Sequence, residues 1–176
     1  MITKIDNKKI FVAVSINDFF SLACSFVFAY DGTDFLQATE QKEAEVYNIS
    51  NYFSNNDSFS EDLVIIDSKF KIFKLDINPV DSDPECKEFN IDLIFEDEFL
   101  EEEKNKLFNK IKTDIEETYK NGGKDINLLH FSIKESEKQE LSLEDINSFL
   151  TTTLGVRITD DFKIEKIQKA VSIENQ

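Results

Sequence analysis

Residues 89–120, FNIDLIFEDEFLEEEKNKLFNKIKTDIEETYK, decide the fold because two hydrophobic periods follow one another directly. In residues 89–95 apolar side chains recur at every second position, which is the period of a strand with one buried face. In residues 98–120 they recur at three- and four-residue spacing, which is typical of an amphipathic helix. The helical stripe consists of Leu100, Leu107, Phe108, Ile111, Ile115 and Tyr119. We therefore expect a half-buried strand followed by the longest helix of the chain, at about 98–120.

Upstream of this unit, short apolar runs separated by turn residues predict further strands. They lie at about 10–14, 22–30, 33–38, 63–67 and 70–77. Asp31-Gly32 between two of these runs predicts a hairpin, because the tight turn requires a residue that accepts positive φ. A helix is expected at about 40–53 with Thr39 as its cap. Its apolar face would be formed by Val46, Ile49, Tyr52 and Phe53.

Downstream of the long helix the pattern is weaker. Asn121-Gly122-Gly123 provides a helix stop, and residues 128–133 predict another strand. Ser142 and Asp145 have the spacing of a capping box, which predicts a short helix at about 143–151. Residues 156–173 fit either a hairpin or a helix, and the spacing of their isoleucines favours the helix.

Together these elements predict the α+β class, with residues 1–176 in a single compact domain. Several strands follow one another through short turns, so we expect a largely antiparallel or mixed sheet of about six or seven strands, with three or four helices. Neither a linker nor an internal repeat divides the chain. Seventeen Phe residues supply the core, and each fully buried Phe contributes about 1.5–3 kcal/mol.

The charge of the chain is concentrated in one segment. Residues 76–103 carry twelve acidic residues and one lysine, which is −11 of the formal net charge of −16. Such a field attracts cationic partners and repels nucleic acid and anionic lipid. Arg157 is the only arginine and no basic stripe is present, so we expect no direct binding to nucleic acid. The longest uncharged stretch, residues 19–30, has twelve residues, whereas a membrane helix needs about twenty.

Residues that usually carry catalysis are scarce. Four glycines cannot form a phosphate-binding loop, and no serine stands in a nucleophile elbow. His130 is the one histidine, and its strand pattern favours a structural role over that of a general base. Cys24 and Cys86 are too few and too far apart for a disulfide framework or a zinc ribbon, which favours reduced thiols. The sequence therefore predicts a cytoplasmic protein without enzymatic activity and without a cofactor.

Clustered carboxylates leave a metal-dependent hydrolase as a second alternative. The alternating acids of residues 81–85 resemble a calcium loop, but Cys86 stands where that loop needs glycine and Pro84 hinders the wrap. Asp76 followed by Glu85-Cys86-Lys87 matches a metal-nuclease pattern. However, an acid two residues before a lysine occurs six times in this chain, so the match is weak evidence.

The leading hypothesis assigns the acidic segment 76–103 to the binding of a basic, nucleic-acid-handling protein partner. Roles of this kind include an inhibitor, an immunity or anti-defence protein of a bacterium or phage, and a nucleic-acid mimic. The simpler interpretation is that the acidic segment is an ordinary solvated surface without a partner. Acidic residues at the start of a helix are also favoured by the helix dipole. The expected partner-binding residues are Asp81, Asp83, Glu85, Glu88, Asp92, Glu96, Glu98, Glu101 and Glu102.

The first alternative is a secretion chaperone or a small structural subunit of a multiprotein assembly. Its binding surface would be apolar and built from the Phe-rich residues 19–30. The sequence leaves the oligomeric state open.

Overall fold

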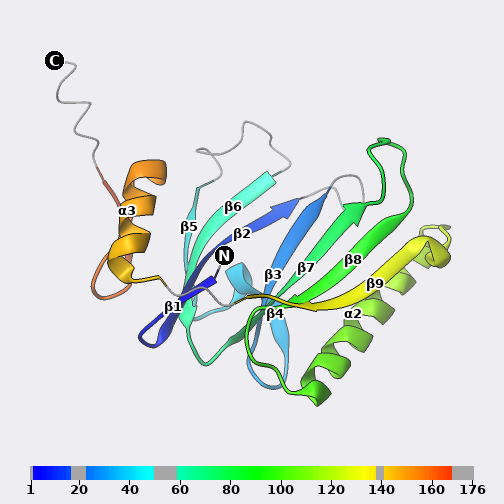
Figure 1. Cartoon of the computed structure of the whole chain (residues 1–176), viewed down its shortest axis with the longest axis horizontal. Coiled ribbons are helices and arrows are strands. Elements are labelled where there is room, and N and C mark those ends of the chain that lie inside the picture. Colours follow the sequence, from blue (N-terminus) through cyan, green and yellow to red (C-terminus); the bar gives the residue numbers. More distant parts are fainter. Residues whose placement is uncertain (1, 17–22, 50–58, 138–140, 168–176) are drawn as a thin grey trace.

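A computed structural model describes residues 2–16, 23–49, 59–137 and 141–167 (Figure 1). Within these ranges the chain forms eleven strands in three sheets, two α-helices and two short 3-10 helices. None of the described helices is long and apolar enough to cross a membrane. The expected single sheet of six or seven strands with three or four helices is therefore wrong, because the strands divide between sheets. That residues 1–176 form one domain stays a prediction.

The first sheet, sheet A, has four antiparallel strands in the order β1-β2-β6-β5. Its strands are β1 (Ile2–Ile5), β2 (Lys8–Ile16), β6 (Phe59–Asp67) and β5 (Glu45–Asn48). The strand expected at 10–14 is the middle of β2, and the one expected at 63–67 is the second half of β6. The sequence analysis missed β1, which is short and carries only two apolar residues.

The second sheet, sheet B, has five strands in the order β4-β3-β7-β8-β9. They are β3 (Cys24–Tyr30), β4 (Phe35–Gln37), β7 (Lys71–Pro79), β8 (Phe89–Phe95) and β9 (Leu129–Glu135). Every pair is antiparallel except β8 and β9, which run parallel. A parallel pair needs a long crossover, and here it is α2 (Glu101–Asn121) followed by the 3-10 helix η2 (Ile126–Leu128).

Three apolar clusters hold these elements together. Phe11 of β2, Val64 of β6 and Val27 of β3 belong to a cluster shared by the two sheets. The other face of sheet A packs against α3 (Leu143–Leu154) and the hairpin of β10 (Val156–Ile158) and β11 (Ile164–Lys166). The other face of sheet B packs against α2. Figure 1 shows α3 beside sheet A and α2 along sheet B.

Local patterns predicted several elements correctly. The Asp31-Gly32 hairpin joins β3 to β4, with Gly32 at a φ of 102° and Tyr30 opposite Phe35. The strand at 89–95 and the long helix form as expected. The capping box is also present: Ser142 Oγ accepts the Asp145 N–H at 3.1 Å.

Two expected helices are strands or turns in the structure. The segment 40–53 contains the end of a 3-10 helix, η1 (Ala38–Glu40), and then β5, which pairs with β6. Val46 and Ile49 fit a helical face, but pairing with β6 also buries Ile49 and half-buries Tyr47. Residues 156–167 form the β10–β11 hairpin, the less favoured of the two alternatives. Tyr52, Phe53 and residues 168–173 lie outside the described residues.

Candidate protein-binding surface

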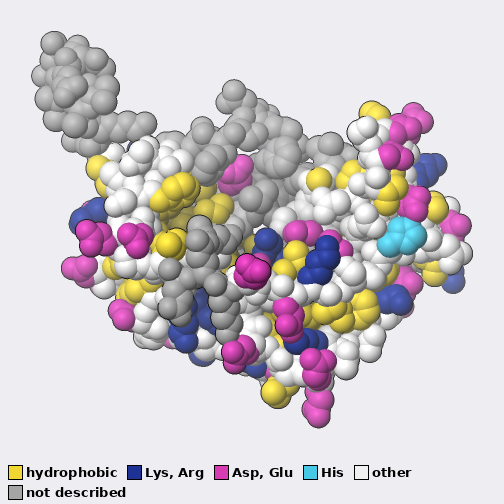
Figure 2. All heavy atoms as spheres, in the orientation of Figure 1, with side chains coloured by type: hydrophobic (Ala, Val, Ile, Leu, Met, Phe, Trp, Pro, Cys, Tyr) yellow, Lys and Arg dark blue, Asp and Glu magenta, His cyan; other side chains and the backbone are white. Residues whose placement is uncertain are grey.

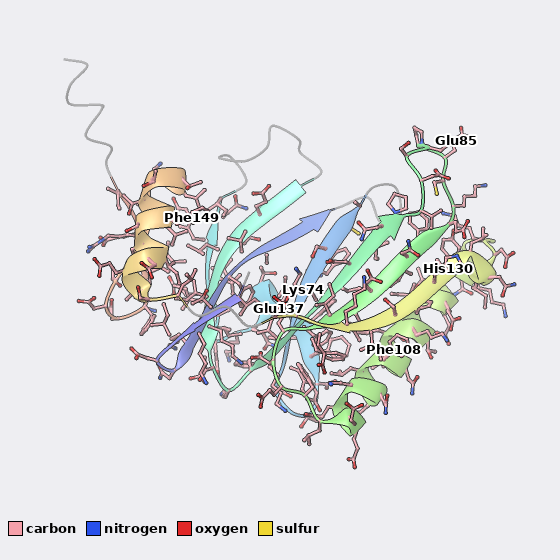
Figure 3. All side chains as sticks on the ribbon, in the orientation of Figure 1. Lys74, Glu85, Phe108, His130, Glu137 and Phe149 are labelled. Carbon is pink, nitrogen blue, oxygen red and sulfur yellow. The ribbon has the colours of Figure 1, made fainter. Side chains whose placement is uncertain are left out.

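The loop that joins β7 to β8 presents three of the expected carboxylates to solvent. Asp81, Asp83 and Glu85 are exposed at its tip, which Figure 3 marks with Glu85. Asp81 Oδ1 accepts the Asp83 N–H at 2.9 Å, and Asp83 Oδ1 accepts the Glu85 N–H at 2.9 Å. These side-chain-to-backbone bonds fix the turn. Among the described residues, no lysine, arginine or histidine forms an ion pair with these three carboxylates.

The face of sheet B that points away from α2 carries a row of polar residues that crosses four of its strands. Ser25, Asp76, Asp92 and Ser132 lie opposite one another in register across four strands. Ser25 Oγ donates to Asp76 Oδ1 at 2.7 Å, and Ser132 Oγ donates to Asp92 Oδ1. Each aspartate of the central pair therefore receives a hydroxyl from the outer strand next to it, which compensates part of the cost of placing two carboxylates side by side.

Asp92 of β8 and the two acids that flank this strand, Glu88 and Glu96, are paired with cationic side chains or with His130. Asp92 Oδ2 lies 2.9 Å from Lys134 Nζ, Glu96 lies 3.8 Å from Lys74 Nζ, and Glu88 Oε2 lies 2.6 Å from His130 Nε2. Burial alone would raise the pKa of Asp92. The hydrogen bonds from Ser132 and Lys134 outweigh this effect and lower its pKa below the ordinary aspartate value. These acids are thus part of a cross-strand network.

The start of α2 carries the remaining acids, and several of them are also paired. Glu101 lies 3.2 Å from Lys104 Nζ. Glu103 accepts a 2.7 Å bond from Lys71 Nζ and a 2.9 Å bond from the Leu100 N–H. The bond from Lys71 is the main reason why the pKa of Glu103 is lowered. Glu98 and Glu102 are exposed.

The nine expected binding residues do not form one continuous patch. The β7–β8 loop lies at the beginning of β8 and the start of α2 follows its end. Seven strand residues span about 20 Å. Figure 2 shows magenta side chains at the tip of the loop (upper right) and at the lower edge of the molecule, with further magenta and dark blue side chains between them. The acids therefore fall into two groups: three loop carboxylates without an ion pair among the described residues, and a strand and helix start whose acids are largely paired.

The structure does not bring together the residues of the sequence patterns that suggested a metal site. Within the described ranges, no group of three or more His, Cys, Asp or Glu side chains is arranged to hold a metal ion. The residue opposite Asp76 is Asp92, whereas Glu85 and Lys87 lie in the loop beyond Pro79. The metal-nuclease pattern requires the Asp on one strand and the Glu and Lys on the next. Because Glu85 and Lys87 lie in a loop, the structure does not place them opposite Asp76.

The sequence patterns did not predict which side chains would pair with the acidic residues. Lys74, His130 and Lys134 lie on neighbouring strands, and their partners stand 22 to 42 positions away in the chain. The alternation in residues 89–95 identified the outward face of β8 correctly. It carried no information about which side chains the neighbouring strands would place beside it, because register depends on tertiary pairing.

Comparisons with protein-family models, curated protein sequences and solved structures find no match for this chain.

Proposed function

We propose that this chain is a non-enzymatic, cytoplasmic protein-binding module that recognises a basic surface on a nucleic-acid-handling partner. The footprint is the β7–β8 loop with Asp81, Asp83 and Glu85 at its centre, which is narrower than the segment 76–103. An inhibitor or an immunity protein works by such recognition. The acids of the loop attract the partner and orient it.

The observation that carries this proposal is the difference in partners between the loop and the other acids. Most of the other acids already have Lys or His partners that a cationic protein would have to displace, namely Glu88, Asp92, Glu96, Glu101 and Glu103. The Asp81 and Asp83 carboxylates accept backbone N–H groups of their own turn, and within the described residues no ion pair involves either of them or Glu85. Each keeps an oxygen free of those bonds, and an exposed carboxylate loses little hydration until a partner arrives.

The alternative of an apolar docking surface in residues 19–30 has less support. Val27, Ala29 and Tyr30 are buried in the cores on the two sides of sheet B, and Phe26 and Phe28 pack against the α2 core. Residues 19–22 lie outside the described residues. The described part of this segment is an interior strand.

The test compares two triple variants that remove the same charge from opposite ends of β8. Asp81→Asn, Asp83→Asn and Glu85→Gln neutralise the loop. Glu98→Gln, Glu101→Gln and Glu102→Gln neutralise the helix start. The probe is a fluorescent decalysine peptide, titrated at about 50 and 500 mM salt, because screening separates electrostatic from other contacts.

We expect the loop variant to bind the peptide at least about tenfold more weakly at low salt, a loss of about 1.4 kcal/mol. The helix-start variant should differ from the parent by less than about threefold. Equal losses in both variants would mean that only net charge matters and would overturn the proposal, as would unchanged binding in the loop variant.

A further inference from the structure

Strand β9 is one of the two edge strands of sheet B. Strand β9 pairs over all seven residues with β8 on one side. On its other side, the described part of the chain provides no strand, since β9 ends the order of sheet B. An unpaired edge presents a row of N–H and C=O groups that a further strand can bind.

The two sides of this edge differ in character. On the α2 side, Phe131 is half-buried against Phe108, with ring centroids 6.3 Å apart, and Ile133 is 40% exposed. Lys112 Nζ lies 5.7 Å from the Phe131 ring centroid on the same side. A neighbouring strand would therefore find apolar contacts here, together with a cation that disfavours basic side chains.

The opposite side of the edge is polar and carries an excess of carboxylates. Strand β9 contributes His130, Ser132 and Lys134 to it. The face extends inward to Asp76, Glu88, Asp92 and Glu96, against which stand the two lysines Lys74 and Lys134. Lys74 and Lys134 pair with Glu96 and Asp92, so this face keeps an excess of two carboxylates over lysines, and that excess favours basic over acidic side chains in a strand placed beside β9.

The edge is also continuous with the acidic loop. His130, near the beginning of β9, contacts Glu88 at 2.6 Å, and Glu88 closes the β7–β8 loop through its carbonyl, which accepts the Val80 N–H at 3.1 Å. Figure 3 shows His130 below the loop that carries Glu85. A segment lying along β9 would thus end beside the carboxylates of the loop.

We propose that the basic partner inserts an extended segment along β9 as a sixth strand of sheet B. Its apolar side chains lie over Phe131 and Ile133, and its alternate, basic side chains lie on the polar face. This inference rests on the proposed function: it takes the basic partner proposed there and adds that the partner's binding segment is extended. A second copy of this chain is a poorer occupant, since two bodies of net charge −16 repel each other.

The experiment uses the full chain and three nine-residue fluorescent peptides built from lysine and valine. In the first, lysine and valine alternate. The second has the same composition with the valines in one block. The third repeats the first with N-methyl groups at alternate backbone positions, which removes hydrogen-bond donors. Affinity is measured by fluorescence anisotropy, and sedimentation velocity reports the oligomeric state.

We expect the alternating peptide to bind at least about tenfold more tightly than the block peptide, and N-methylation to abolish this advantage. Ile133→Lys, at an exposed position, should weaken the alternating peptide about fivefold and the block peptide much less, because the block peptide is affected only by the added charge. Circular dichroism confirms that the variant is folded.

The outcomes separate the two proposals. If the alternating and block peptides bind equally and the loop triple variant weakens both, the edge inference is overturned while the proposed function stands. If the loop variant weakens neither peptide, the proposed function fails as well. A concentration-dependent dimer that Ile133→Lys dissociates would assign the edge to a second copy and overturn the inference.

Discussion

Lys9 Nζ lies 2.9 Å from Asp97 Oδ2, and this ion pair connects the two main sheets. Lys9 belongs to β2 of sheet A and is only 5% exposed, whereas Asp97 follows β8 of sheet B. Lys9 Nζ also donates to the Phe70 carbonyl at 2.5 Å, and Asp97 Oδ2 accepts the Ile72 N–H at 2.6 Å. The buried Lys9 and the half-buried Asp97 therefore each have more than one hydrogen-bond partner.

Removing the cation from this pair should destabilise the protein strongly. Lys9→Met leaves the Asp97 carboxylate without its counter-ion, and breaking a buried pair costs about 3 kcal/mol. Urea unfolding measures the loss. Lys69→Met is the control, because Lys69 pairs with Glu43 at the exposed surface and should change stability little. Equal midpoints for the two variants would show that the Lys9 pair does not tie the sheets together.

Phe73 is the centre of the aromatic core, and truncating it should be severe. It is fully buried, and the rings of Phe28, Phe35, Phe95 and Phe99 lie 5.3–6.0 Å from its centroid. Phe73→Ala should cost about 3–5 kcal/mol through lost burial and a residual cavity. Phe73→Leu provides a milder variant if alanine prevents folding.

The same truncation at an exposed phenylalanine is the control. Phe149 on α3 is 57% exposed, so Phe149→Ala should change the free energy of unfolding by less than about 0.5 kcal/mol. A comparable loss at both positions would contradict the assignment of Phe73 as the centre of the core.

Asp92 should stabilise the fold in a pH-dependent way. Its pKa is lowered in the folded chain, so its contribution is present above the ordinary aspartate pKa of 3.8 and is lost as pH falls through the folded value. Asp92→Asn should therefore be less stable than the parent at pH 7, with a difference that shrinks below pH 4. Urea unfolding at several pH values tests this.

A direct titration gives an independent measurement. The Asp92 carboxyl carbon, followed by NMR, should titrate with a midpoint below 3.8. A midpoint above that value would mean that burial outweighs the bonds from Ser132 and Lys134.

The two thiols should react at very different rates. Cys24 is buried in the α2 core, and burial with the nearby Asp76 charge raises its pKa to about 11. At pH 8 only about one molecule in a thousand then carries the Cys24 thiolate, which is the reactive form. Cys86 is half-buried in the β7–β8 loop. A disulfide reagent should modify the Cys86 thiol quickly, and Cys86→Ser should remove this fast phase. The Cys24 thiol should react quickly only after denaturant has exposed it.

The sequence-based predictions were correct where an element depends on residues close together in the sequence, and wrong where it depends on distant ones. The strand at 89–95, the long helix and the Asp31-Gly32 hairpin depend on neighbouring residues, and all three are present. The helix expected at 40–53 failed because β5 is stabilised by β6, whose paired residues stand 14–20 positions later in the chain. The same lack of long-range information concealed the division of the strands into three sheets.

By itself, the sequence determined the periodicity of each strong element, the phenylalanine content of the core and the large negative charge. It did so because periodicity, composition and charge are properties of neighbouring or summed residues. Tertiary pairing of the strands determined which carboxylates meet Lys134, Lys74 or His130, and which carboxylates of the β7–β8 loop have no ion pair among the described residues. That outcome depends on strand register, and register is fixed when segments distant in sequence bury their apolar faces together.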